Sequence, residues 1–190
     1  MIGGRARSAI IGIALLVAAA IVTVTAPTDD DVQSPLAVRG TLGETVQSRL
    51  VAVTVHDVAL ARELTFDGEL DPPSSTPGVW VVVDLTAVCR MDACSFGRSE
   101  LRLGERVFAP ATLAPPPSFV QQGASPGLPY RQSALFEVPL DAIESGEAEL
   151  TVQPSTTRAL ESVAVVELAL PDSIDATAPA ERARLVETGS

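Results

Sequence analysis

The sequence predicts an all-β protein, one antiparallel β-sandwich behind a single N-terminal membrane-spanning helix. Three observations support this fold class. Residues 9–26 form an uncharged, mostly apolar run. About seven short segments with strand periodicity follow between residues 44 and 170, and no long amphipathic helix separates them. The hydrophobic fraction of 46% excludes a disordered chain and is sufficient for a packed core.

The apolar run at 9–26 has the length of a transmembrane helix. As a helix it would measure about 27 Å, close to the hydrocarbon thickness of about 30 Å. Arg5 and Arg7 precede it, and acidic residues follow from Asp29. This charge asymmetry places residues 1–8 in the cytoplasm and the rest of the chain outside it. We therefore expect a single-pass protein of the cell membrane with an extracytoplasmic C-terminal domain.

A cleaved signal peptide is the alternative interpretation of residues 9–26. Small residues that could precede a cleavage site occur at 18–20 and at 24–26. An apolar Ile-Val-Thr-Val stretch follows the first site, and Pro27 follows the second. Both features favour a retained signal anchor, whereas cleavage would release the same domain in a secreted form.

The strand pattern begins after a spacer. Residues 27–43 lack periodicity and are expected to be an extracytoplasmic linker, so the sandwich is expected to span residues 44–170. Val51, Val53 and Val55 alternate with smaller or polar residues, but the phase slips at His56-Asp57. A slip of one residue reverses the two faces of a strand, which predicts a β-bulge there. Residues 66–77 are rich in Asp, Pro, Ser and Gly and predict a loop.

The strongest strand pattern is residues 78–89, in which every second residue from Val79 to Cys89 is apolar. The opposite face, with Trp80, Asp84 and Thr86, is mixed. Residues 101–108 predict a hairpin around Gly104-Glu105. Residues 110–129 contain six prolines, which argue against regular structure there. Three further strands are expected near 134–140, 148–152 and 163–170. Residues 171–190 are polar and are expected to form a C-terminal tail.

The two cysteines, Cys89 and Cys94, have a C-x4-C spacing. Outside the cytoplasm such a pair is expected to be oxidised, and the short loop can return Cys94 to bridging distance. A redox-active pair more often has C-x-x-C spacing at a helix N-terminus. We therefore predict a structural disulfide, which the chain-entropy relation values at roughly 2 kcal/mol.

Composition excludes several functions. All 13 basic residues are arginine, and they face 24 acidic ones, giving a net charge of −11. Such a chain offers little to nucleic acid. One histidine and two cysteines cannot build the usual zinc or iron–sulfur site, and we expect no metal or other cofactor. Lysine and asparagine are absent. Their codons are rich in A and T, which suggests a high-GC genome.

Candidate catalytic residues are few, and we expect no enzyme. His56 is adjacent to Asp57, but neighbours in a strand point to opposite faces, so they form no direct dyad. Asp84 lies in an apolar strand, where a raised pKa would be notable. A position on the outer face or a pair with an arginine is the simpler interpretation. The acidic runs at 29–31 and 67–71 suggest calcium, but no EF-hand spacing supports it.

Several local patterns together resemble the extracytoplasmic domains of the DUF4352 family, an immunoglobulin-like group that includes secreted mycobacterial antigens. They occur in the order 53–61, 78–86, 101–108, 126–129 and 135–139. The resemblance covers about residues 44–170. It implies an immunoglobulin-like sandwich and an actinobacterial source, and it provides no catalytic residue to transfer. Cys89 and Cys94 are not a hallmark of the family.

These patterns predict a membrane-anchored immunoglobulin-like domain with a binding or assembly role in the cell envelope. Its partners would be the membrane, through residues 9–26, and other envelope proteins. Capture of a small ligand or a metal ion by one end of the sandwich is the alternative. A hydrolase using Asp84 is a third hypothesis, for which no converging His, Ser or Cys set is present.

Overall fold

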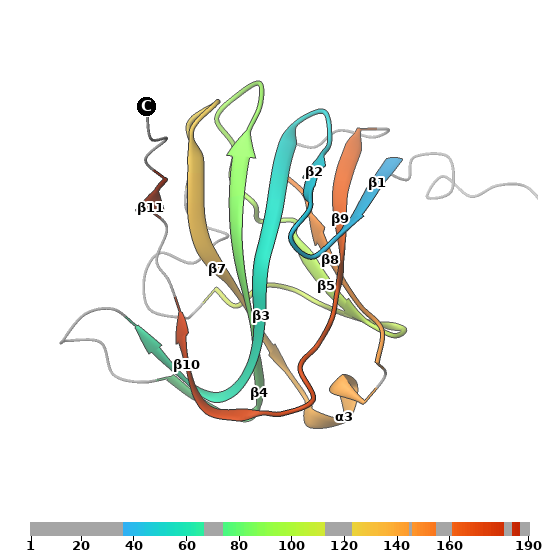
Figure 1. The fold of residues 1–190 in the computed structure, drawn as a ribbon, viewed down its shortest axis with the longest axis vertical. Helices are drawn as coiled ribbons and strands as arrows, with labels where there is room; N and C mark the ends of the chain where they lie inside the picture. Colours follow the sequence, from blue (N-terminus) through green and yellow to red (C-terminus); the bar gives the residue numbers. More distant parts are fainter. Residues whose placement is uncertain are drawn as a thin grey trace, which may run out of the picture. The chain divides into compact units, whose positions relative to one another are not determined.

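The computed structural model describes residues 36–66, 74–112, 123–144, 146–154, 161–180 and 184–186. They form two facing β-sheets, so the expected β-sandwich is confirmed (Figure 1). The five-stranded sheet has the order β1-β9-β8-β5-β6. Its strands are β1 (Leu36–Thr41), β5 (Glu100–Leu103), β6 (Arg106–Phe108), β8 (Ala148–Val152) and β9 (Ser162–Leu168).

The six-stranded sheet has the order β10-β3-β4-β7-β11, and β2 also pairs with β3. Its two longest strands, β3 and β4, have 16 residues each and pair with one another. The strands are β2 (Thr45–Gln47), β3 (Val51–Phe66), β4 (Ser74–Cys89), β7 (Pro129–Val138), β10 (Asp175–Ala180) and β11 (Arg184–Leu185). A four-residue helix, α3 (Leu140–Ile143), joins β7 to β8.

The main core lies between the sheets, as the alternation in β4 predicts. The residues from Val79 to Cys89 that share its apolar face are all buried and belong to one cluster. Leu101, Leu150 and Val166 meet them from the opposite sheet. Each buried aliphatic side chain of this size contributes about 1.5–3 kcal/mol.

Two local predictions are confirmed. The register of β3 against β4 shifts between Val55 and Asp57, so the β-bulge lies where the hydrophobic phase slips. Because of it, His56 and Asp57 are both exposed, although they are neighbours. The expected hairpin joins β5 to β6, and Gly104 makes its turn with a φ of 57°, a left-handed conformation that favours glycine.

The expected boundaries of the sandwich are too narrow at both ends. Leu36–Thr41, expected to be linker, pairs in parallel with β9. Asp175–Ala180, expected to be a frayed tail, pairs in parallel with β3. The sandwich is therefore not purely antiparallel. Parallel partners far apart in the sequence hold both strands through the main chain, and side-chain periodicity does not report such pairing.

Loop expectations need smaller corrections. Phe66 and residues 74–77 belong to β3 and β4, while residues 67–73 lie outside the described part of the chain. Pro129, expected to lie in irregular chain, begins β7. It is the first residue of its strand, where a missing N–H is tolerated.

A second, smaller core lies on the outer face of the six-stranded sheet. Trp80, Val82 and Leu135 point away from the main core, and Ala178 and Ala180 of β10 pack against them. The sequence shows this face of β4 as mixed because the strand that covers it comes almost a hundred residues later. The strand β10 thus completes the outer core of this sheet.

The N-terminal predictions lie outside the described residues. These are the cytoplasmic residues 1–8 with Arg5 and Arg7, the apolar run at 9–26 and most of the linker. Among the residues that the structure does describe, no helix is long and apolar enough to cross a membrane.

Candidate functional site

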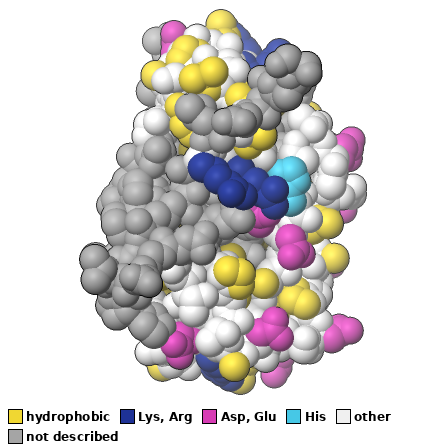
Figure 2. Space-filling model, turned by 60° about the vertical axis from the view of Figure 1, so that its left-hand side comes forward, with side chains coloured by type: hydrophobic (Ala, Val, Ile, Leu, Met, Phe, Trp, Pro, Cys, Tyr) yellow, Lys and Arg dark blue, Asp and Glu magenta, His cyan; other side chains and the backbone are white. Residues whose placement is uncertain are grey.

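A group of polar side chains crosses β3, β4 and β7 on the outer face of the six-stranded sheet. We call it the outer polar cluster; its members are His56, Asp57, Asp84, Thr86, Arg131 and Ser133. The strand register places Asp57, Asp84 and Ser133 in one row and Thr86 beside Arg131. Figure 2 shows the chain's only histidine against arginine side chains, with acidic residues close by.

Asp84 pairs with Arg131, as one of the two sequence interpretations holds. Arg131 Nε and Nη2 donate to the two carboxylate oxygens of Asp84 at 3.2 and 2.5 Å. The Asp84 side chain is 18% exposed and that of Arg131 38%. A carboxylate held on both oxygens by a guanidinium is a structural cross-strand link and a poor general base. This geometry gives no support to a hydrolase that uses Asp84.

His56 and Asp57 have separate partners. His56 Nε2 and Thr86 Oγ1 are 2.8 Å apart, within hydrogen-bond distance. The backbone N–H of Val58 donates to Asp57 Oδ1 at 2.9 Å. His56 is thus oriented by a hydroxyl. The expectation that His56 and Asp57 point to opposite faces is wrong, because the bulge leaves both side chains exposed on the outer face, each with its own partner.

The described residues line several surface hollows. The outer polar cluster borders one of about 150 Å³, lined by Asp57, Asp84 and Ser133 together with Ala59, Val82 and Pro179. Ligand pockets usually measure roughly 300–1,000 Å³ and enclose most of the ligand. A larger, open hollow of about 500 Å³ lies on the five-stranded sheet, beside Arg102, Glu147, Glu149 and Glu167. Within the described residues, no group of three or more His, Cys, Asp or Glu side chains is placed to hold a metal ion.

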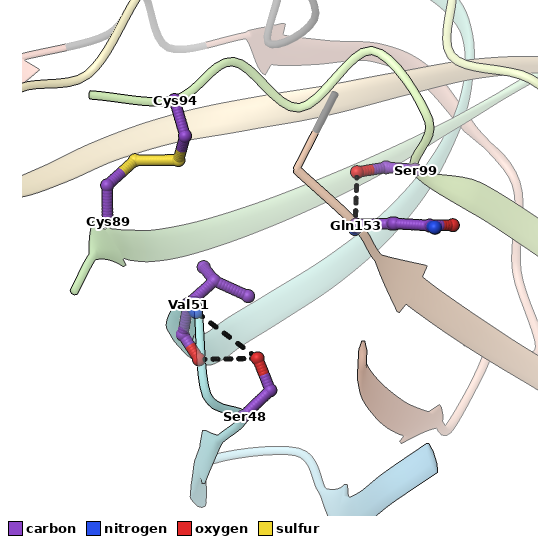
Figure 3. The surroundings of a disulfide bond; sticks show 6 residues. All are labelled: Ser48, Val51, Cys89, Cys94, Ser99 and Gln153. Atoms are coloured by element: carbon purple, nitrogen blue, oxygen red, sulfur yellow. Dashed lines mark hydrogen bonds between the residues drawn. A yellow bond between two sulfur atoms is a disulfide. The ribbon is translucent and has the colours of Figure 1, made fainter. Parts of the chain in front are cut away.

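The predicted disulfide is present. Cys89, the last residue of β4, is bonded to Cys94 across a Cα–Cα distance of 6.0 Å (Figure 3). Cys94 exchanges two backbone hydrogen bonds with Ala124, at 3.1 and 2.8 Å, and Gly127 N–H donates to the Cys89 carbonyl at 2.7 Å. The bridge therefore ties the end of β4 to the segment that leads into β7. Both cysteines are buried, which suits a structural disulfide.

The outer edge of β1 is the second candidate surface. We define the β1 edge as the side of β1 that faces away from β9, over the residues Leu36, Ala37, Val38 and Arg39 (Figure 1). Leu36 is 66% exposed and Val38 36%, and no side chain of β1 is buried. Open strand edges of this kind can add a strand from another chain, unless charges, prolines or bulges block them.

The other described edges are blocked or short. The β10 edge carries Pro179, which has no N–H to donate. The β11 strand has two residues. On β6, Arg106 pairs with Asp141 at 3.1 Å, and this hydrogen bond holds the pKa of the Asp141 carboxyl below its usual value. Among the described strands, β1 is the edge with the least protection.

Sequence reasoning missed the β1 edge, and several of its other candidates cannot be placed. Leu36 and Val38 do alternate with other residues after Pro35, but two positions are too few to establish a strand period. The acidic residues at 29–31 and 67–71 lie outside the described residues, as do Arg5 and Arg7.

Comparisons with known proteins identify no family for this chain. No protein-family model matches the chain, and no curated protein is similar to it. One solved structure, an uncharacterized β-sandwich protein from Clostridium difficile 630, covers 75% of this chain with 99% of its own length. Its TM-score is 0.48 and the sequence identity is 9%. The resemblance to the DUF4352 family, and with it an actinobacterial source, therefore stays a prediction.

Proposed function

We propose that this chain is an envelope protein that displays a non-catalytic, immunoglobulin-like binding or assembly domain. Residues 9–26 anchor it in the cell membrane, and Arg5 and Arg7 keep its N-terminus in the cytoplasm. The domain then faces the outside, where a disulfide such as Cys89–Cys94 persists. A relation to the DUF4352 family belongs to the same proposal.

The strand order supports the immunoglobulin-like part. In immunoglobulin domains strands A, B and E share one sheet, and C, F and G share the other. Here β3, β4 and β7 are neighbours in one sheet, while β5, β8 and β9 are neighbours in the other. Taken in chain order, they occupy the places of A, B and E and of C, F and G. β6 then corresponds to the extra strand C′ of variable-type domains.

The observation that carries the binding role is the β1 edge. It presents exposed apolar side chains and main-chain groups in the first described strand of the domain. Apolar residues on an open edge are a liability that natural proteins usually suppress. Exposed Leu36 and Val38 at this edge are accounted for if another chain covers them. The linked Asp84–Arg131 and His56–Thr86 pairs supply no competing catalytic arrangement.

Site-specific photo-crosslinking of the full chain in living cells tests this proposal. A photoreactive residue replaces Ala37 on β1 or, as a matched control, Thr177, an exposed residue on β10. We expect protein adducts from position 37 and none from position 177. In spheroplasts, added protease should degrade the domain from outside. A domain protected inside the cell, or equal adducts at both positions, would refute the proposal.

A further inference from the structure

We propose that the β1 edge binds the β1 edge of a second copy of this chain. The two strands would lie antiparallel about Val38 and join the two five-stranded sheets into one. This inference rests on the binding role proposed above for the same edge, and it names the partner. Main-chain groups, side-chain sizes, charge and symmetry each support it.

Within the part of the chain that the structure describes, the main chain of β1 has a short set of groups without a hydrogen-bond partner. Leu36 N–H donates to the Glu161 carbonyl at 3.0 Å, so the polar groups of Leu36 point towards the β9 side. Direction alternates along a strand, and hence Ala37 and Arg39 direct their N–H and C=O outwards. Thr41 also points outwards, but Glu44 occupies both its groups, at 3.2 Å through the side chain and 3.1 Å through the backbone.

Ala37 and Arg39, whose main-chain groups point outwards, are separated by one residue, Val38. This spacing defines a register in which β1 can pair with a second β1. When a second β1 approaches antiparallel, Ala37 lies opposite Arg39 of the second copy, and Arg39 opposite its Ala37. Each is a hydrogen-bonded pair, in which the two residues exchange both N–H···O bonds. Val38 lies on the two-fold axis between them. All outward main-chain groups of Ala37 and Arg39 are satisfied, and Glu44 marks the end of the pairing.

The side chains fit the same register. On the core side of the sheet, Val38 meets Val38 of the second copy in a closely spaced non-hydrogen-bonded pair. Leu36 lies opposite Gly40, which carries no side chain. The exposed surfaces of Leu36 and Val38 are thereby covered, and a large residue faces a small one at each end.

Charge does not oppose the pairing. On the outer face of the sheet, Arg39 lies opposite Ala37 of the second copy, so like charges are not directly opposite. Arg39 is also paired with Glu149 of its own domain. Directly opposed like charges would be destabilising, and this register avoids them.

Symmetry makes the assembly a closed dimer. The same patch serves both copies, so the interface is isologous and is used up by two chains. The opposite edge of the same sheet, β6, is three residues long and carries the Arg106–Asp141 pair, which limits further addition.

The proposed anchors are compatible with this dimer. About 3.4 Å per residue places the two Leu36 residues some 14 Å apart along the strands. The covalent chain of residues 27–35 can span at most about 30 Å. The covalent reach of each linker therefore exceeds the separation of the two Leu36 residues along the strands.

Cysteine crosslinking of the full chain tests the register directly. Val38→Cys places two thiols on the two-fold axis, where the Cα–Cα distance is about 4.5 Å and a disulfide can form. Val107→Cys is the matched control, because Val107 is an exposed valine, 48% accessible, on the opposite edge of the same sheet. In isolated membranes treated with a mild oxidant, we expect a reducible dimer from Val38→Cys and a monomer from Val107→Cys.

A second variant separates association from folding. Ala37→Pro removes an outward N–H that no described residue accepts, and edge strands tolerate proline. Added to Val38→Cys, it should reduce the dimer band at least tenfold while the thermal unfolding of the chain in detergent stays within a few degrees. A Val38→Cys chain that stays monomeric, or a dimer that Ala37→Pro leaves unchanged, overturns the inference.

The outcomes also distinguish this inference from the proposed function. Suppose that Val38→Cys stays monomeric while a photoreactive residue at position 37 still captures another protein. The partner is then not a second copy of this chain, whereas the proposed binding role of the β1 edge is supported. If position 37 captures nothing and Val38→Cys stays monomeric, both are wrong.

Discussion

β1 and β10 come from opposite ends of the described chain and are alike in their backbones. Each has six residues, and each pairs in parallel with a strand of the sandwich. They differ in what their side chains do: β10 buries Ala178 and Ala180 against Trp80, whereas β1 buries none. β10 therefore belongs to the hydrophobic structure of the fold, and β1 is held by its main chain and by the Arg39–Glu149 pair. Burial, and not strand pairing alone, distinguishes a closing strand from an available one.

The largest expected difference between the two strands comes from a buried charge. Ala178→Asp places a carboxylate in the cluster with Trp80, so we expect a loss of about 3 kcal/mol or more in unfolding free energy. Ala37→Asp makes the same change at an exposed position of β1 and should stay within about 0.5 kcal/mol. Urea unfolding of the two full-length variants in detergent measures both. Equal losses would show that β1 is as integral as β10.

A change remote from both strands separates stability from association. Cys89→Ala combined with Cys94→Ala releases the loop after β4, and the chain-entropy relation predicts a loss of about 2 kcal/mol. Urea unfolding measures it, with the oxidised, disulfide-bonded wild-type chain as the reference. Because neither cysteine belongs to β1 or to its partner strand β9, the dimer fraction in light scattering should not change. A parallel loss of dimer would show that association through the β1 edge depends on the disulfide. It would contradict the separation of stability from association.

Gly40 tests whether β1 needs its close approach to the core. A Cβ built at Gly40 would lie 2.5 Å from Val46 Cγ2, and Val46 is buried. Gly40→Ala should therefore displace β1 and cost about 1–2 kcal/mol. Gly123→Ala is the control, because among the described residues no atom beyond its two chain neighbours lies within 4 Å of a Cβ built there. Thermal unfolding of both variants measures the difference; a harmless Gly40→Ala would mean that β1 is more loosely placed than described.

The smallest effect concerns the β6 edge and depends on pH. The hydrogen bond from Arg106 holds the pKa of Asp141 below its usual value. A lowered pKa in the folded state stabilises above the ordinary pKa of the carboxyl and is lost as the pH falls through the folded value. Asp141→Asn should remove only this small part of the acid dependence, because both side chains are well exposed. Acid titrations of both chains by circular dichroism check it, and a large shift at neutral pH would contradict the assignment.

The sequence predicts the centre of this molecule better than its ends. The β4 strand, the bulge after Val55 and the hairpin at Gly104 follow from local alternation, phase and turn chemistry, and all three are present. The disulfide is expected from the C-x4-C spacing together with the predicted extracytoplasmic location, and the Cys89–Cys94 bond is present. These features depend on residues close together in the chain, which is where periodicity carries information.

The terminal strands could not be predicted in the same way. β1 is held by β9, whose residues are more than 120 positions away, and β10 by β3 at a similar distance. Alternation in β10 is present in Ala178 and Ala180, but small residues broken by Pro179 resemble a turn. The sequence alone does not show that Arg131 is the partner of Asp84, because only the register of β4 against β7 selects this arginine.

Hydrogen exchange tests the contrast between the two strands most directly. The full chain in detergent is measured by mass spectrometry over a concentration series, with peptides covering 36–41 and 175–180. We predict that protection of the β1 peptide rises with concentration, because a second copy covers the amides of Ala37 and Arg39, while the β10 peptide stays unchanged. A β1 peptide with concentration-independent exchange, or both peptides rising together, would contradict this assignment of the edges.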